Sequence, residues 1–417
     1  MASSPGSAFA TVSHDLHRQR RGVMNPFFSK ARIVKLEPLI RSKIDKLSAR
    51  FAQAAKDGSV TRLDVAFMAM TTDIFSDYAF GYDDRYLDEP DFKKIWKETI
   101  QGGFEGASQS RQMPWLAPLV MGLPRSFLKS ALPQIYFFLR WQDGVKVHVD
   151  RIMSEPSPTV EQKETPKTMF HALRDCDLPA SERTASRIVD EGVVIMGAAS
   201  ETVAHTLSIT TYFLMAEPGQ KMIARVAEEI KSIMPSATAT PTYPQLEQLP
   251  YLSAVIAEGI RMGWGVTTRL PRIANDEDLV FVDKSRHGKE WVIPRGTPVS
   301  SVGYFVLSDP MIFPDPHTFK PERWLITEAD GSVKRNVKLE KYLVSFGKGS
   351  RQCLGMNLAY GELFLTLPML VWDLFPNFEL YGTIKERDVD LKHDFFTGMP
   401  ELDSPGIRVK AKGDIKA

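Results

Sequence analysis

The stretch Phe346 to Gly355 reads FGKGSRQCLG and places one cysteine at the exit of a glycine-rich loop, just before a helix expected at 356–374. Backbone N–H groups at the start of that helix, together with the neighbouring Arg351, are expected to stabilise a thiolate at Cys353 and to lower its pKa. Glycines at positions 349 and 355 let the backbone lie flat against a large group. The simpler alternative is a small, buried, apolar cysteine in an ordinary turn.

The same stretch matches the pattern F-x-x-G-x-R-x-C-x-G at all five of its defined positions. This pattern resembles the signature loop of the haem-thiolate monooxygenases, the cytochrome P450 family. The resemblance implies that Cys353 is the metal ligand, binding the iron of haem b. It also implies that the loop contacts this cofactor through the other matching residues, Phe346, Gly349, Arg351 and Gly355.

Two further segments match the family in order and spacing. Glu258 and Arg261 form an E-x-x-R pair, which puts both side chains on one helix face and which by itself is a common surface ion pair. Arg323 lies in a downstream Pro-Glu-Arg segment. In the family that arginine joins the E-x-x-R pair, so the resemblance implies that the three residues form a structural network behind the haem.

The long helix expected at 182–217 contains Ala-Ala-Ser-Glu-Thr at 198–202, which resembles the oxygen-activating A-G-x-[DE]-T stretch with Ala199 in place of the usual glycine. The resemblance assigns catalytic roles to Thr202, as a hydrogen-bond donor to dioxygen, and to Glu201, as a proton relay. Small residues at 197–199 are expected to let the helix open or bulge. Without this context, the pair would be interpreted as a solvated acid and a β-branched helix residue.

Haem propionates need cationic partners, which the family draws from several places. Arg351 is one, and Arg21 is another because a W-x-x-x-R helix occurs here as His17 to Arg21, with histidine in place of tryptophan. A third is expected just after the E-x-x-R helix, where Arg272 is preferred and Arg269 is the rival. The resemblance thus implies that Arg21, His17, Arg351 and Arg272 bind the cofactor.

Position within the family also suggests which residues line the substrate pocket. All of them are apolar or small, as in any protein core, so the substrate class, a hydrophobic terpenoid or polyketide-like molecule, follows from the resemblance. Within the family, the chain looks most like filamentous-fungal enzymes of the trichodiene-oxygenase type. The expected lining residues are Val194, Ala198, Val266, Thr267, Phe395, Phe396 and Met399.

The composition is that of an ordinary globular chain of 417 residues, with 43% hydrophobic and 25% charged residues. The 52 basic and 51 acidic residues give a net charge of +1, which argues against a nucleic-acid-binding protein. Two cysteines, Cys176 and Cys353, are too few for a disulfide framework or a multi-cysteine zinc site. The longest apolar stretch, 363–375, is too short to span a bilayer, so no membrane anchor is expected in this chain.

The apolar periodicity predicts a mainly α protein with small β-sheets, and the resemblance implies the multi-helical cytochrome P450 fold as a single domain over residues 1–417. Ser181 is expected to cap the long helix, and residues 103–132 and 154–167 are expected to be irregular. Helices are expected at 16–24, 31–56, 62–78, 91–102, 133–152, 182–217, 220–234, 249–262 and 356–374, and strands at 279–282, 291–293 and 299–302.

The match to the family begins at the helix near His17. In full-length eukaryotic members, a membrane anchor, two early helices and most of the first β-sheet precede that helix. The chain is therefore expected to be truncated at its N-terminus and to lack these elements. The location that the resemblance implies is the cytosolic face of the endoplasmic reticulum.

The resemblance implies a monooxygenase that places one oxygen atom in a C–H bond of a hydrophobic small molecule and releases the other as water. The thiolate donates electron density through iron and favours O–O cleavage. Electrons are expected from NADPH through a separate flavoprotein reductase, because the chain has no G-x-G-x-x-G site. We expect a monomer that binds no nucleic acid. Two alternatives stay open: a truncated, catalytically inactive relative, and a haem-binding or interaction module without turnover.

Overall fold

The computed structural model describes residues 4–156, 159, 167–236, 239–283 and 288–413. Helices dominate it, as the apolar periodicity predicts. Those of the first half are α1 (His14–Met24), α2 (Lys30–Asp57), α3 (Leu63–Phe80), α4 (Lys94–Gln112), α5 (Leu116–Met121), α6 (Arg125–Ala131), α7 (Pro133–Ser154), α9 (Met169–Asp175) and α10 (Ala185–Ala216). Those of the second half are α11 (Lys221–Ser232), α12 (Tyr243–Leu246), α13 (Pro250–Met262), α14 (Gly303–Leu307), α15 (Val337–Glu340), α16 (Met356–Met369) and α17 (Lys385–Asp388).

The described strands are short and antiparallel. They are β1 (Thr61–Arg62), β2 (Arg272–Ile273), β3 (Leu279–Asp283), β4 (Lys289–Ile293), β5 (Pro298–Val299), β6 (Leu325–Thr327), β7 (Val333–Arg335), β8 (Phe378–Leu380), β9 (His393–Phe395), β10 (Thr397–Met399) and β11 (Arg408–Ala411). One sheet has the strand order β1–β11–β8, and the other four pair β10 with β9, β2 with β5, β3 with β4, and β6 with β7. Because Thr397 pairs with Phe395, Phe396 lies at the tip of the β9–β10 hairpin.

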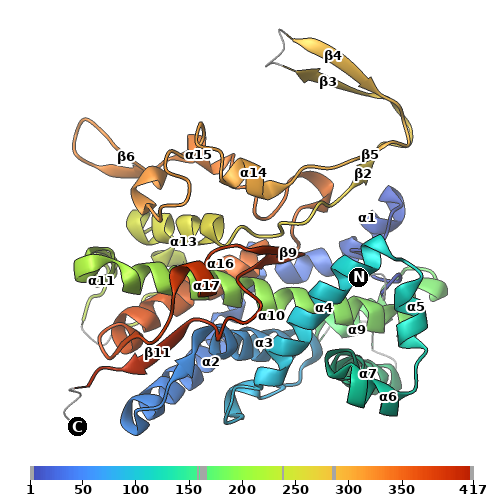
Figure 1. The fold of residues 1–417 in the computed structure, drawn as a ribbon, viewed down its shortest axis with the longest axis horizontal. Coiled ribbons are helices and arrows are strands. Elements are labelled where there is room, and N and C mark those ends of the chain that lie inside the picture. The colour runs from blue at the N-terminus through green and yellow to red at the C-terminus, as the bar shows by residue number, and fades with distance from the viewer. Residues whose placement is uncertain (1–3, 157–158, 160–166, 237–238, 284–287, 414–417) are drawn as a thin grey trace.

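Helix α10 runs through the middle of the molecule (Figure 1). It contains 32 residues, so it is ~48 Å long at ~1.5 Å per residue. It packs against α3, α7 and α13, and much of α3 is buried on every side. By length and composition α10 is the one described helix that could cross a membrane, yet 56% of its most apolar window is buried inside the molecule. This burial is what a central core helix shows.

The β3–β4 hairpin projects from the helical body (Figure 1). Its strands pair from Leu279 opposite Ile293 to Asp283 opposite Lys289. The hairpin is held by its own ladder and contributes little to the core, because its large apolar side chains are exposed: Val280, Phe281, Val282, Trp291 and Val292.

The prediction of irregular structure at 103–132 is wrong, because α4 continues to Gln112 and is followed by α5 and α6. A glycine in a helix costs only ~1 kcal/mol relative to alanine, which packing against a neighbouring helix offsets. At Gly102 a Cβ atom would meet Gln134 of α7 at 2.9 Å. Glycine therefore permits the close approach of α4 and α7 instead of ending the helix.

The predicted cap of the long helix is also wrong. Ser181 lies in a 3-10 turn at Ala180–Arg183, and the hydroxyl of Thr184 accepts the hydrogen bond from the Arg187 N–H that caps α10. The strand expected at 299–302 is limited to Pro298–Val299. Most of the loop expected at 154–167 lies outside the described residues. The other predicted helices agree with the structure to within a few residues at most ends.

Candidate active site

The loop before α16 is shaped by two glycines and closed by one hydrogen bond. Gly347 and Gly349 have φ values of 68° and 75°, in the left-handed region that favours glycine. The Cys353 N–H donates to the Phe346 carbonyl at 2.8 Å, and the Phe346 ring packs against Tyr360. Gly355, at the N-cap of α16, has an ordinary φ of −82°. A Cβ at Gly349 or Gly355 would meet no atom within 4 Å, so one side of the loop is open.

The Cys353 side chain is accessible to solvent at this open side. Desolvation by the surrounding protein raises the pKa of the thiol, and the Gly355 N–H and the charge of Arg21 oppose the rise without cancelling it. The expectation of a lowered pKa, supported by Arg351, is therefore wrong for the protein alone. Arg351 instead donates to the carbonyls of Thr11, at 2.7 Å, and Val12, at 3.1 Å.

A group of cationic side chains gathers beside the loop. Burial and the charges of Arg351, Arg21 and Arg272 lower the pKa of His17 to about 4, so His17 is neutral at neutral pH. Arg269 and Arg272 are both exposed, and Arg272 is the one whose charge acts on both His17 and Arg351. None of the three arginines forms an ion pair with any residue that the structure describes; their bonds go to backbone carbonyls and to Asn25.

An accessible stripe runs along the otherwise buried α10. Val194, Ala198 and Thr202 follow one another at intervals of four residues, on one helix face, and none of them is fully buried. The Thr202 hydroxyl donates to the Ala198 carbonyl at 3.0 Å. The expected opening near 197–199 is not found, because α10 is continuous from Ala185 to Ala216. The side chains of this stripe are nevertheless accessible, although α10 is otherwise buried.

Glu201 lies beside this stripe but is buried. Its Oε1 atom is 2.6 Å from the Nζ atom of Lys97 on α4, while its Oε2 atom has no hydrogen-bond partner. Burial raises the pKa of the Glu201 carboxyl, and Lys97 opposes that rise. Lys97 was not identified from the sequence. No local pattern joins two residues that are 104 positions apart.

The E-x-x-R pair lies at the centre of a closed hydrogen-bond network. Both Glu258 and Arg261 are fully buried, and Arg261 binds the two carboxylate oxygens of Glu258 at 2.8 and 2.9 Å. Glu258 also accepts from Arg323 at 3.1 Å, from the Trp324 indole at 2.8 Å and from the Lys320 N–H at 2.9 Å. The structure thus brings the three residues of the expected network together and adds Trp324.

An aromatic cluster lies at the tip of the β9–β10 hairpin. Phe396 lies 5.3 Å from Phe104 of α4 and 6.2 Å from Phe9, measured between ring centroids. Its φ of 77° is unusual for a bulky residue, and its carbonyl is held by the Thr267 N–H at 3.0 Å. Phe9 and Phe104 were missed from the sequence, because their contact with Phe396 depends on three distant segments meeting.

The other expected pocket residues are divided. Val266 forms a β-bridge with Thr397, which places it next to the hairpin. The Thr267 hydroxyl donates to Asp394 at 2.8 Å, and Met399 accepts a weak bond from Gln101 of α4. Phe395 instead stacks on His393, so it does not belong to the Phe396 cluster. Of these four expected residues, Val266, Thr267 and Met399 therefore lie around the Phe396 cluster, and Phe395 lies outside it.

Three of these observations fit haem b, a flat group with two carboxylates. Cys353 presents an accessible sulfur on the open side of a loop that carries no side chain at Gly349 or Gly355. Accessible small residues of α10 leave space. Arg272 and Arg21 repel Arg351, and none of the three has an anionic partner in the described part of the chain, so two propionates would relieve this repulsion. Cys353, Arg21, Arg272 and Arg351 are the residues that would hold the group.

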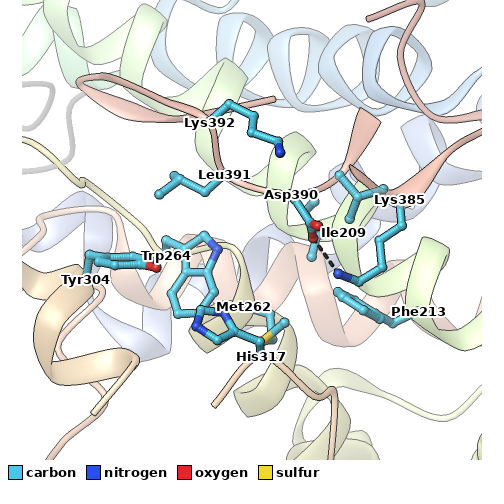
Figure 2. Close-up of a pocket in the computed structure, with 11 residues that line it drawn as sticks. Ile209, Phe213, Met262, Trp264, Tyr304, His317, Lys385, Asp390, Leu391 and Lys392 are labelled. Carbon is cyan, nitrogen blue, oxygen red and sulfur yellow. Dashed lines mark hydrogen bonds and ion pairs between the residues drawn. The ribbon is translucent and has the colours of Figure 1, made fainter. Parts of the chain in front are cut away.

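A separate cavity of about 240 Å³ lies next to Met262, the last residue of α13. Figure 2 shows Trp264, Tyr304 and Phe213 among the residues that line it. It contains none of the residues expected at the site. Lys385 and Asp390 at its wall form an ion pair of 2.6 Å. The cavity therefore lies apart from the candidate active site.

Comparison with known proteins gives a consistent family. The family model described as cytochrome P450 matches residues 3–381. The cytochrome P450 monooxygenase claJ of Penicillium crustosum is 36% identical, over 98% of this chain and 89% of that protein. The cytochrome P450 monooxygenase TRI4 of Trichoderma arundinaceum is 39% identical, over 99% of this chain and 75% of that protein.

A solved structure has the same fold. The crystal structure of the cytochrome P450 CYP102L1 superposes with a TM-score of 0.70 at 18% sequence identity, covering 99% of this chain and 82% of that chain. The predicted fold, mainly α with small sheets, is thus confirmed. On the family match and on the identity to fungal relatives, the chain belongs to the cytochrome P450 family of monooxygenases.

Proposed function

We propose that the protein is a haem-thiolate monooxygenase of fungal secondary metabolism that inserts one atom of dioxygen into a C–H bond of a hydrophobic small molecule, of terpenoid type. The observation that carries the proposal is the accessible Cys353 residue beside three arginines that have no anionic partner among the residues that the structure describes. When bound there, haem b supplies oxygen activation that no side chain can provide. Cys353 would ligate its iron, and Arg21, Arg272 and Arg351 would bind its propionates, with neutral His17 as a hydrogen-bonding neighbour.

The protein's own residues would position substrate and protons. Thr202, on the accessible face of α10, would turn its hydroxyl away from the Ala198 carbonyl and hold a proton at its oxygen atom, and Glu201 would supply that proton. Phe396, Phe104 and Phe9 would cover an apolar substrate and exclude water. The Glu258 network would hold α13 against residues 314–324.

The remaining partners follow the family. We propose that electrons arrive from NADPH through a separate flavoprotein reductase, and that the chain works as a monomer and a single domain over residues 1–417. The assignment to fungal metabolism is supported by the TRI4 relative, which is a cytochrome P450 monooxygenase from the fungus Trichoderma arundinaceum. The cytosolic face of the endoplasmic reticulum is the proposed location.

The test is the reduced, carbon-monoxide-bound absorption spectrum of the haem-reconstituted chain, with C353S as its control. A strongly red-shifted Soret band in the wild type, lost in C353S, supports the proposal, because only thiolate ligation gives that shift. A folded wild-type chain without the band would overturn it in favour of a catalytically inactive relative. A band without NADPH-dependent turnover of any hydrophobic substrate would favour a haem-binding module.

A further inference from the structure

Lys97 is a buried cation whose partner is the acid that the proposed reaction uses. The two side chains are 4% and 1% exposed, and the Nζ–Oε1 distance is 2.6 Å. Lysine and glutamate are almost never buried this fully unless they are paired. The pair also joins two helices, since Lys97 lies on α4 and Glu201 on α10. Removing either charge would leave the other buried without a counter-charge.

Lys97 is the described side chain that contacts the Glu201 carboxyl. Asp64, which begins α3 after β1, and Arg62 of β1 act on Glu201 in opposite directions. These two residues also bind each other at 2.6 Å. His205, one turn along α10, has a pKa lowered by burial to about 4 and is therefore neutral at neutral pH. Lys97 is thus the group that binds the Glu201 carboxyl directly, whereas Asp64 and Arg62 act on it through their charges alone.

The position of Lys97 on α4 indicates that the Lys97–Glu201 ion pair belongs to the candidate active site. Lys97, Gln101 and Phe104 are spaced four and three residues apart, so they lie along one face of α4. Gln101 contacts Met399 and Phe104 contacts Phe396, both of the β9–β10 hairpin. The same helix face therefore contacts the proposed substrate cover and the proposed proton relay.

We propose that Lys97 is a positioning residue for the Glu201 relay: it fixes the Glu201 carboxyl through the α4–α10 ion pair and stabilises its ionised form, so that the carboxyl can pass a proton toward Thr202. Held in this way, Oε1 is occupied, and Oε2, which has no partner in the structure, is the atom free to take up the proton. The relay role rests on the proposed function, whereas the pairing itself does not. Only O–H bonds form and break in this step. Glu201 takes up one proton and releases one proton toward Thr202, so its carboxyl returns to its starting state.

The test is an infrared titration of the full chain that follows the carboxylic-acid C=O stretch of Glu201, assigned by its loss in E201Q. In K97M the midpoint of Glu201 protonation is expected to rise by about one pH unit or more, because the contact that stabilises the carboxylate is gone. K97R, which keeps the charge, is expected to stay near the wild type. Equal midpoints in the wild type and K97M would overturn the proposal.

The matched control is K43M, which removes another buried lysine from a different part of the chain. Lys43 lies on α2 and pairs with Asp77 and Asp83 at 3.1 and 2.7 Å. K43M should leave the Glu201 midpoint unchanged. A rise in K43M as large as that in K97M would show general loosening and would count against the specific pairing.

Two further comparisons keep the proposal testable. If K97M does not fold, the pairing predicts that K97M/E201Q folds again, since no unpaired carboxylate is left; a double variant as unfolded as K97M would overturn the proposal. In the reconstituted enzyme, K97M should divert electrons from product to hydrogen peroxide, and K97R should restore the product. A shifted midpoint with an unchanged ratio of product to peroxide would keep the pairing and overturn the relay role of Glu201.

Discussion

The network around Glu258 allows a prediction with a magnitude. E258Q keeps the shape of the side chain but removes its charge, so the Arg261 guanidinium stays fully buried opposite a neutral amide. Breaking a buried ion pair from one side costs ~3–5 kcal/mol, a large share of the ~5–15 kcal/mol that stabilises a typical native protein. Hydrogen bonds from Arg261 to the Leu307 and Pro316 carbonyls remain, which favours the lower end of that range.

The assay is urea unfolding followed by tryptophan fluorescence, with Trp324 as a reporter inside the network. R323A should cost less, ~1–3 kcal/mol, because Glu258 keeps Arg261 as its counter-charge. D150N is the matched control: it removes the carboxylate of the exposed Lys146–Asp150 pair and should change the free energy of unfolding by less than ~1 kcal/mol. An E258Q variant that is destabilised no more than D150N would refute the reasoning.

Three other changes test separate parts of the structure. Burial raises the pKa of Glu362 well above its ordinary 4.5, so the wild type should lose stability as the pH rises above 4.5, and E362Q should not. The measurement is the unfolding midpoint of both proteins at acidic and at alkaline pH. The same change of midpoint with pH in both proteins would contradict this prediction. R272Q should weaken haem binding in a titration roughly tenfold, whereas R269Q should leave it unchanged; equal losses would place Arg272 outside the propionate site. F396A removes a ring from the aromatic cluster, so it should raise KM for an apolar substrate several-fold with a smaller effect on kcat, as steady-state kinetics would reveal; an unchanged KM would exclude Phe396 from the substrate cover.

The Glu258–Arg261 pair could be predicted from the chain because its members are three residues apart on one helix, whereas Arg323, 65 positions from Glu258, was added to it by the family resemblance. The loop that presents Cys353 is equally local: two left-handed glycines and one backbone hydrogen bond shape it within ten residues. In both cases the sequence spacing and the spatial arrangement are nearly the same thing. Local patterns also predicted most helices, since their apolar faces recur at the helical period.

Errors arose where local signals compete. Ser181 and Thr184 are both good helix caps, and the structure uses Thr184 because Ser181 lies within the 3-10 turn that precedes α10. Gly102 signals a break, yet its missing side chain is what lets α4 approach α7. The helix start and Arg351 predict a lowered pKa for the Cys353 thiol, but the desolvation that raises this pKa depends on all the atoms around the sulfur.

The sequence by itself determined the family, the helical class and the short motifs, because each of these is written in residues a few positions apart. Only the tertiary structure decided that Lys97 faces Glu201 and that Phe9 and Phe104 meet Phe396. Such contacts depend on how distant helices and loops pack together, and no local period records that packing. The electrostatics of the site follow the same rule, since burial is a property of the whole fold and not of any one segment.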